Sequence, residues 1–144
     1  MKKRDFLKTS AIAASSVFLP KSLMSNEQSS KKLSTAHIGV GGMGFEDLKA
    51  ISSHKNVEII GLCDVDSEAL VKSKLRFPNV KTYKDYRVML NELSDKIDAV
   101  IISTPDHTHA PAALMAMKKN KAVYCQKPLA HHVSEVREMR KIAE

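Results

Sequence analysis

Tryptophan is absent from this 144-residue chain, and only 5% of its residues are aromatic. Proteins that bind single-stranded nucleic acid stack the bases on aromatic side chains. Because aromatic residues are scarce here, we do not expect such a surface. The formal charge of +7 also suggests nucleic acid, but residues 1–32 hold seven of the 23 Lys and Arg residues and only two of the 16 acidic ones. Because the remainder is close to neutral, we expect no nucleic-acid partner.

Cysteine is scarce too: Cys63 and Cys125 are the only two, and they form no Cys-x-x-Cys pair. His107 and His109 form a His-x-His pair, but no third ligand lies at a suitable spacing, so we expect no metal site. The cysteines end two apolar runs that would lie on opposite sides of the first strand of a doubly wound sheet. That separation is too large for a disulfide, and we expect buried thiols.

No apolar run reaches the roughly 20 residues that a membrane-spanning helix requires, so we expect no stable membrane span. Residues 1–32 instead have the basic start, short apolar run and polar linker of an export signal. The stretch Lys3–Lys8 resembles the bacterial twin-arginine motif, with Lys3 in place of its first arginine. We expect export to the periplasm, or retention in the cytoplasm if this Lys-Arg variant is not recognised. A disordered basic tail is the alternative interpretation.

The most informative positive feature is Gly39–Gly44, a Gly-x-Gly-x-x-Gly loop that directly follows an apolar run. Asp64 lies twenty positions beyond the loop, at the end of a second apolar run. This spacing is typical of a dinucleotide-binding turn. The first glycine permits the tight turn, the second lets a pyrophosphate approach the backbone, and the third lets the helix pack close to the strand. A plain glycine turn is the alternative, and the surrounding pattern favours binding.

Apolar runs alternate with helical spacing along residues 33–144, which indicates βαβ units and an α/β fold with a Rossmann-type, doubly wound parallel sheet. Right-handed crossovers should place helices on both faces of this sheet. The expected strands are 35–40, 57–63, 80–83, 99–103 and 122–125. The expected helices cover about 43–51, 67–76, 86–93, 110–117 and 133–142.

Ligands of open parallel sheets bind beyond the carboxyl ends of the strands, where the strand order reverses. Four polar or turn-forming segments leave those ends here: 39–44, 64–66, 104–109 and 126–129. Lys127 lies in the last of them and precedes Pro128, which restrains the backbone. A solvated lysine is the alternative, but the position favours a ligand-facing role. The pair His131-His132 follows in a turn, where we expect exposure to solvent.

Together these segments resemble the N-terminal domain of the Gfo/Idh/MocA oxidoreductases, the family of glucose–fructose oxidoreductase and inositol dehydrogenase. The matching stretches are 38–44, 63–66, 98–109 and 126–130, and the resemblance covers residues 33–144. It implies NAD as the cofactor, with NADP disfavoured because an acid at position 64 repels a 2′-phosphate. It also implies a sugar or polyol substrate that reacts at a CH–OH group. The cofactor-binding residues that it implies are Gly39, Gly41, Gly42, Met43, Gly44, Asp64, Thr104, Pro105, His109 and Gln126.

Lys127 matches the lysine of the family's Glu-Lys-Pro motif, beside the substrate and the nicotinamide, and is the implied catalytic residue; the motif's glutamate is Gln126 here. Family members continue into a second α/β domain that supplies most of the substrate pocket, an Asp/His pair for proton transfer, and a sheet through which full-length members often form homo-oligomers. We therefore expect this chain to be truncated before its substrate domain, to bind NAD weakly, and to be inactive alone. Two alternatives are an NAD-dependent glycosidase of the same superfamily and a non-catalytic, cofactor-binding regulator.

Overall fold

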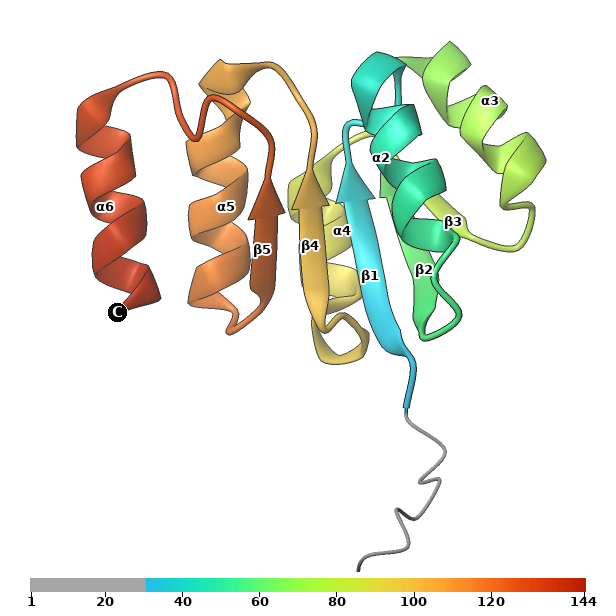
Figure 1. The fold of residues 1–144 in the computed structure, drawn as a ribbon. Coiled ribbons are helices and arrows are strands. Elements are labelled where there is room, and N and C mark those ends of the chain that lie inside the picture. Colours follow the sequence, from blue (N-terminus) through green and yellow to red (C-terminus); the bar gives the residue numbers. More distant parts are fainter. Residues whose placement is uncertain (1–30) are drawn as a thin grey trace, which may run out of the picture. The chain divides into compact units, whose positions relative to one another are not determined.

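The structure is a computed structural model that describes residues 31–144 (Figure 1). Five parallel strands form one sheet in the order β3-β2-β1-β4-β5. The chain moves outward from β1 in one direction, then returns and continues on the other side, so the order reverses between β1 and β4. This arrangement confirms the predicted Rossmann-type, doubly wound sheet. The strands are β1 (Leu33–Ile38), β2 (Val57–Cys63), β3 (Lys81–Tyr83), β4 (Ala99–Ile102) and β5 (Ala122–Cys125).

Within residues 31–144, five α-helices connect or follow these strands, and two short 3₁₀ turns accompany them. The helices are α2 (Gly42–Ser52), α3 (Ser67–Arg76), α4 (Tyr86–Glu92), α5 (His109–Lys118) and α6 (Val133–Ala143), and the 3₁₀ turns are η3 (Ser94–Lys96) and η4 (Asp106–Thr108). Asp66 and Asp85 cap α3 and α4, because each carboxylate accepts a backbone N–H of the first turn. The predicted ranges 57–63, 67–76 and 122–125 are confirmed, whereas β1 ends two residues before the expected 40. Gly39 has a φ of +81°, which turns the chain out of the sheet.

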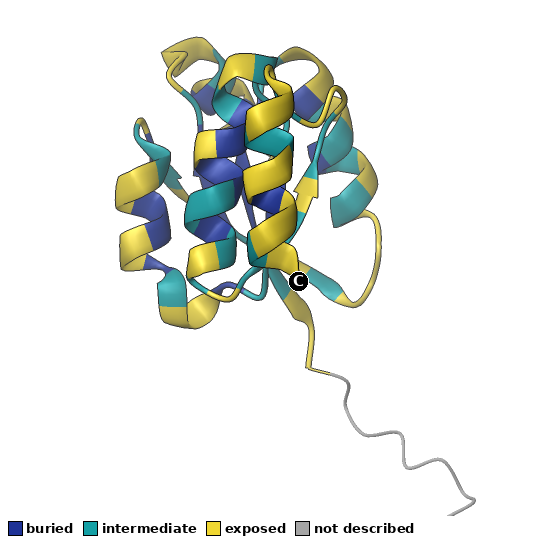
Figure 2. Ribbon diagram, turned by 90° about the vertical axis from the view of Figure 1, so that its left-hand side faces the viewer, coloured by how far each residue is buried: buried dark blue, intermediate teal, exposed yellow. Residues whose placement is uncertain are grey.

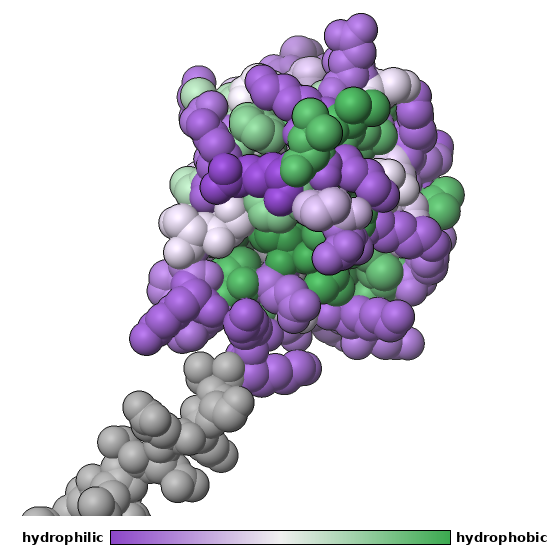
Figure 3. Space-filling view, turned by 90° about the vertical axis from the view of Figure 1, so that its right-hand side faces the viewer, coloured by the Kyte–Doolittle hydropathy of each residue, from purple (hydrophilic) through white to green (hydrophobic). Residues whose placement is uncertain are grey.

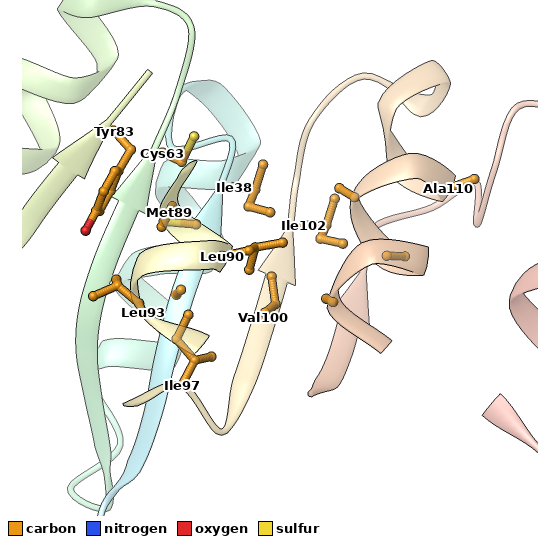
Figure 4. Close-up of a cluster of buried hydrophobic side chains, with 14 of the residues drawn as sticks. Ile38, Cys63, Tyr83, Met89, Leu90, Leu93, Ile97, Val100, Ile102 and Ala110 are labelled. Atoms are coloured by element: carbon orange, nitrogen blue, oxygen red, sulfur yellow. The ribbon is translucent and has the colours of Figure 1, made fainter. Parts of the chain in front are cut away.

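The core lies in two layers, one on each face of the sheet. On one face, the largest cluster joins Ile38, Val100 and Ile102 of the strands to Met89 and Leu90 of α4 and to small residues of α5 (Figure 4). On the other face, α2 and α3 pack over a second cluster, formed by Val40, Leu48, Leu62 and Leu70. Each fully buried leucine contributes about 2 kcal/mol, so both layers hold the strand ends in fixed positions.

The helical cover is uneven along the sheet. Helix α6 packs against α5 through Met139 and exposes its outer side (Figure 2). Helices α2 and α3 contact β1 and β2, whereas Tyr124 of β5 is 53% exposed on the edge strand. The expectation of helices on both faces therefore holds at the centre of the sheet, and β5 has one solvated face. Figure 3 shows apolar side chains among charged ones on the side that carries α3, where Val71 and Leu75 are 64% and 82% exposed.

Both cysteines are free thiols, as predicted, and two strands separate them in the sheet. Burial raises the pKa of the Cys63 thiol to about 12 and that of Cys125 to about 11. Cys63 is buried, but Cys125 is only half-buried because β5 is an edge strand. Neither thiol is therefore prone to ionise at neutral pH.

The predicted export signal lies outside the described residues, apart from its last two positions. From residue 31 onward, no helix combines the length and the apolar character needed to cross a bilayer.

Candidate nucleotide-binding site

A cleft of about 380 Å³ opens at the carboxyl edge of the sheet, beside the point where the strand order reverses. The hydrogen-bond ladder continues past the strand ends, which holds the loops in register. Gly39 N–H donates to the Cys63 carbonyl (2.8 Å), and Ser103 N–H donates to the Ile38 carbonyl (2.8 Å). The residues that line the cleft are Ile38, Gly39, Gly41, Cys63, Asp64, Val65, Lys84, Tyr86, Ser103, Thr104, Pro105, His107, Thr108 and Ala112.

The glycine loop is packed so closely that two of its glycines have no space for a side chain. A Cβ on Gly39 would lie 2.6 Å from the Ser103 carbonyl oxygen, and a Cβ on Gly44 would lie 2.1 Å from the Gly39 carbonyl oxygen. Gly44 thus lets α2 pack against the end of β1, as expected from its position in the motif. Gly42 needs glycine for a different reason, because its φ is +48° while the space around it is open.

Helix α2 begins in a way that suits an anion. Its N-cap, Gly41, has no side chain to accept the first N–H groups, and the first turn holds no acidic residue. These N–H groups have no acceptor within the helix, and the helix dipole places partial positive charge beside them. Met43 in this turn is 63% exposed. Gly42, Met43 and Gly44 lie in the first turn of α2 and are not part of the cleft lining.

Asp64 lies across from the glycine loop and lines the cleft. Its Oδ2 accepts the N–H groups of Val40 (2.8 Å) and Gly41 (3.2 Å), and its Oδ1 accepts the N–H of Asp66 (2.9 Å). A carboxylate offers about four acceptor positions, so one remains for a ligand hydroxyl. Asp64 therefore holds the glycine loop in place and also presents a hydrogen-bond acceptor to the cleft.

The loop after β4 supplies the opposite wall. Thr104 and Pro105 line the cleft, and so do His107 and Thr108, which are not among the binding residues that the family resemblance implies. The Thr108 N–H donates to the Pro105 carbonyl oxygen (3.0 Å) and closes the 3₁₀ turn η4, and Thr108 Oγ1 donates to Thr104 Oγ1 at 2.7 Å. The turn brings more of the predicted 104–109 segment to the cleft than the motif alone indicated.

His109 differs from the expectation that its side chain lines the cofactor cleft. The residue is 1% exposed, its Nδ1 lies 2.7 Å from the Pro128 carbonyl oxygen, and its Nε2 lies 2.6 Å from the Thr104 carbonyl oxygen. The correction has a plain cause: the first turn of α5 directs the ring inward, between the loops that follow β4 and β5. His109 therefore connects these loops instead of facing the cleft.

Gln126 and Lys127 follow β5, and neither is part of the cleft lining. The Gln126 amide is engaged inside the protein, because its Nε2 donates to Asp47 and its Oε1 accepts the Lys127 N–H (3.2 Å). Lys127 is exposed and its peptide bond to Pro128 is cis. The structure thus places Gln126 as a support for the loop, while the Lys127 amine is accessible to a ligand.

Lys84 and Tyr86 line the cleft and were not predicted as site residues. They follow β3, which has only three residues. Lys84 Nζ donates to Ser67 Oγ, next to the start of α3. Because the sequence does predict a short strand ending at residue 83, the rule that ligands lie beyond carboxyl strand ends was the signal that would have found both.

His131 is exposed, as expected, and it forms a second link between the two loops. Its Nδ1 lies 3.0 Å from Asp106 Oδ2. The hydrogen bond raises the pKa of His131 above its ordinary value and lowers that of Asp106. Within residues 31–144, no three side chains of the kinds that hold metals come together in one cluster.

The fold and the cleft together define a Rossmann-type, nucleotide-binding domain. Residues 33–144 match the Gfo/Idh/MocA family, which is described as "Oxidoreductase family, NAD-binding Rossmann fold". The chain therefore belongs to the Gfo/Idh/MocA oxidoreductase family.

Three relatives illustrate the range of this family. A glycosyl hydrolase family 109 protein of Stenotrophomonas maltophilia is 36% identical over 135 residues, covering 88% of this chain and 29% of that protein. Glucose-6-phosphate 3-dehydrogenase of Bacillus subtilis is 31% identical over 107 residues, which cover 74% of this chain and 29% of that enzyme. The crystal structure of myo-inositol 2-dehydrogenase from Lactobacillus plantarum superposes with a TM-score of 0.72 at 31% identity, covering 78% of this chain and 33% of that one. This chain thus spans no more than 33% of the length of each.

Proposed function

We propose that residues 33–144 bind NAD, and that the protein is the cofactor-binding part of an exported oxidoreductase acting on the CH–OH group of a sugar or polyol. The observation that carries the proposal is the cleft itself. It is lined by Gly39 of the glycine loop, by Gly41, which is the N-cap of α2, and by Asp64. Its volume of about 380 Å³ lies within the range of small-molecule sites.

The residues present fit the cofactor in three respects. The glycine loop leaves the first N–H groups of α2 open to a pyrophosphate, Asp64 keeps one acceptor position for a ribose hydroxyl, and the walls are largely apolar. Lys84 lines the same cleft as Asp64 and is the side chain that favours a 2′-phosphate. We propose NAD rather than NADP because the Asp64 carboxylate, which three backbone N–H groups hold in place, repels a 2′-phosphate.

Calorimetric titration of the chain with NADH and NADPH tests this proposal. We expect NADH to bind more tightly, and we expect Asp64→Asn to narrow the difference, because it removes the charge that repels the 2′-phosphate. The matched control, Asp66→Asn, alters a neighbouring carboxylate that caps α3 and should leave the ratio unchanged. Tighter binding of NADPH by the unaltered chain would contradict the choice of NAD.

Lys127 is the residue that we propose to contact substrate. Bound NAD supplies a hydride acceptor, and an ammonium group near the reacting hydroxyl orients it and stabilises negative charge on its oxygen. The Lys127 backbone is fixed through Gln126, while its side chain is exposed. We propose that the substrate pocket lies in the part of the full-length protein that corresponds to the relatives' remaining length, since this chain spans no more than 33% of each.

A second candidate, an NAD-dependent glycosidase, is favoured by one specific observation. Besides the Stenotrophomonas protein, a protein of Shewanella oneidensis named alpha-N-acetylgalactosaminidase is 39% identical over 107 residues. A protein of the relatives' length distinguishes the two activities by its products. Release of free sugar from an aryl α-N-acetylgalactosaminide without net NADH formation would support the glycosidase, and a keto-sugar formed together with NADH would support the oxidoreductase.

Export to the periplasm is part of the same proposal. The twin-arginine-like stretch Lys3–Lys8 supports it. The match to the Stenotrophomonas protein also covers a larger share of this chain than residues 33–144 supply, so it extends into the N-terminal segment. Fusing residues 1–34 to a fluorescent protein, which fluoresces in the cytoplasm but in the periplasm only when it is exported already folded, tests the route. Periplasmic signal that disappears with Arg4→Gln is expected, and cytoplasmic signal from both fusions would contradict export.

A further inference from the structure

We propose that Asp47 is a positioning residue at the carboxyl edge of the sheet, where the cofactor cleft lies. Its carboxylate orients the Gln126 amide and thereby holds the Gln126–Lys127 segment in place. Asp47 belongs to no sequence motif and does not line the cleft. The proposal rests on the proposed function in one respect only, namely that this edge faces bound NAD.

The Asp47 carboxylate accepts hydrogen bonds from two other chain segments and so joins three segments. Asp47 lies on α2, the helix that follows the glycine loop. Ser103 Oγ, at the end of β4, donates to Asp47 Oδ2 at 2.7 Å. Gln126 Nε2, at the end of β5, donates to Oδ2 at 2.9 Å and to Oδ1 at 3.1 Å. Since charge-assisted hydrogen bonds are about twice as strong as neutral ones, this carboxylate fixes the end of β5 against α2.

The second end of the Gln126 amide completes the argument. With Nε2 directed to Asp47, Oε1 is left to accept the Lys127 N–H. The residue at position 126 must therefore donate on one side and accept on the other, which glutamine does and an ionised glutamate does not. Asp47 thus explains why glutamine occupies the first position of the Gln-Lys-Pro stretch: a glutamate would place two carboxylates about 3 Å apart, and one of them would retain a proton.

The charges around the pair are few. From β1, His37 faces Asp47, and burial keeps that ring neutral above about pH 4. On α2 itself, Glu46 and Lys49 pair with each other at 2.6 Å. Lys127 is exposed beyond the pair. Between pH 5.5 and 8, the difference between Gln126→Glu and the unaltered chain therefore reports the titration of the carboxylate placed at position 126.

Four proteins test the proposal: the unaltered chain, Asp47→Asn, Gln126→Glu and the double variant. In Gln126→Glu the two carboxylates repel, so the urea midpoint, taken relative to that of the unaltered chain, should fall as the pH rises from 5.5 to 8, because the unfolded state releases the proton more readily. In the double variant, the amide introduced at position 47 donates to the carboxylate introduced at position 126, and that carboxylate still accepts the Lys127 N–H. This variant should recover both the midpoint and the pH profile of the unaltered chain.

A measurement of NADH affinity distinguishes a role of Asp47 in positioning from a role in stabilising the fold alone. For Gln126→Glu we expect affinity about tenfold weaker at pH 8 than at pH 5.5, equivalent to about one pKa unit of coupling, and we expect recovery in the double variant. A Gln126→Glu midpoint with the pH profile of the unaltered chain, or a double variant as impaired as Gln126→Glu, would overturn the pairing. Unchanged NADH affinity beside a changed midpoint would overturn the positioning role. Failure of the unaltered chain to bind NADH would instead contradict the proposed function. The urea midpoints would still test the pairing of Asp47 with Gln126.

Discussion

His37 makes the stability of this domain sensitive to acid. The ring lies on β1, is 1% exposed, and its Nδ1 has no hydrogen-bond partner among residues 31–144. Its Nε2 lies 3.3 Å from Thr35 Oγ1. Burial lowers the pKa of His37 from 6.5 to about 4, although the negative charge of Asp47 acts in the opposite direction. The folded state therefore holds this histidine neutral at a pH where the unfolded chain protonates it.

The sign and size of the effect follow from that difference. Above pH 6.5 neither state binds the proton, so His37 has no effect on the pH dependence there. As the pH falls from 6.5 towards 4, the unfolded state binds the proton and the folded state does not, so the free energy of unfolding decreases. The full difference in pKa, from 6.5 to about 4, corresponds to about 3 kcal/mol.

Urea unfolding between pH 7.5 and 4.5 measures the effect, with the unaltered chain compared to His37→Leu. The substitution removes the titration and an unpartnered polar atom. Between these limits, the unaltered chain should lose about 2.5 kcal/mol more than the variant. Taking the difference cancels the contribution of surface carboxylates. The control, His54→Leu, alters an exposed ring and should leave the acid slope in place. Equal slopes for the unaltered chain and His37→Leu would refute the reasoning.

Two further predictions concern the loops of the site. Gly44→Ala should lower the free energy of unfolding by about 3 kcal/mol or more, because its Cβ would overlap the Gly39 carbonyl oxygen. Gly42→Ala should lower it by only about 1 kcal/mol, because of the positive φ at that position. Equal urea midpoints for the two variants would contradict this difference in packing. Asp106→Asn should lower the pKa of His131, measured from its imidazole NMR signals, because the carboxylate that raises that pKa is lost. A His131 titration unaffected by this substitution would show that the pair does not form in solution.

Much of the fold was predictable because its local signals agree. The runs that became β2 and β5 are bounded by turn-forming residues, and Asp66 caps α3 where the pattern begins. The end of β1 was placed two residues late because Val40 is as apolar as the strand before it. Only the backbone turn at Gly39 shows that Val40 packs under α2 and α3 instead.

The site was partly predictable for a different reason. Glycine spacing and the rule about strand ends found Gly39, Asp64 and Thr104, which do line the cleft. They did not find Asp47, whose partners lie 56 and 79 positions away in the chain. Its place on α2 looks, in the sequence, like that of any half-exposed polar residue. The inward direction of His109 was equally hidden, because it depends on carbonyl groups of two separate loops.

NADH titration of Gly41→Ala beside the unaltered chain tests the central claim most directly. Gly41 has an extended backbone that any residue adopts, and the nearest atom to an added Cβ would be the Ala69 Cβ at 3.3 Å. The free energy of unfolding should therefore change by no more than about 1 kcal/mol. The methyl group would nevertheless stand between the glycine loop and the cofactor. We predict NADH binding by the unaltered chain, affinity at least about tenfold weaker for Gly41→Ala, and no change for the control Ser53→Ala at the other end of α2. Equal NADH affinity for the unaltered chain and Gly41→Ala, or no binding by either, would contradict the account.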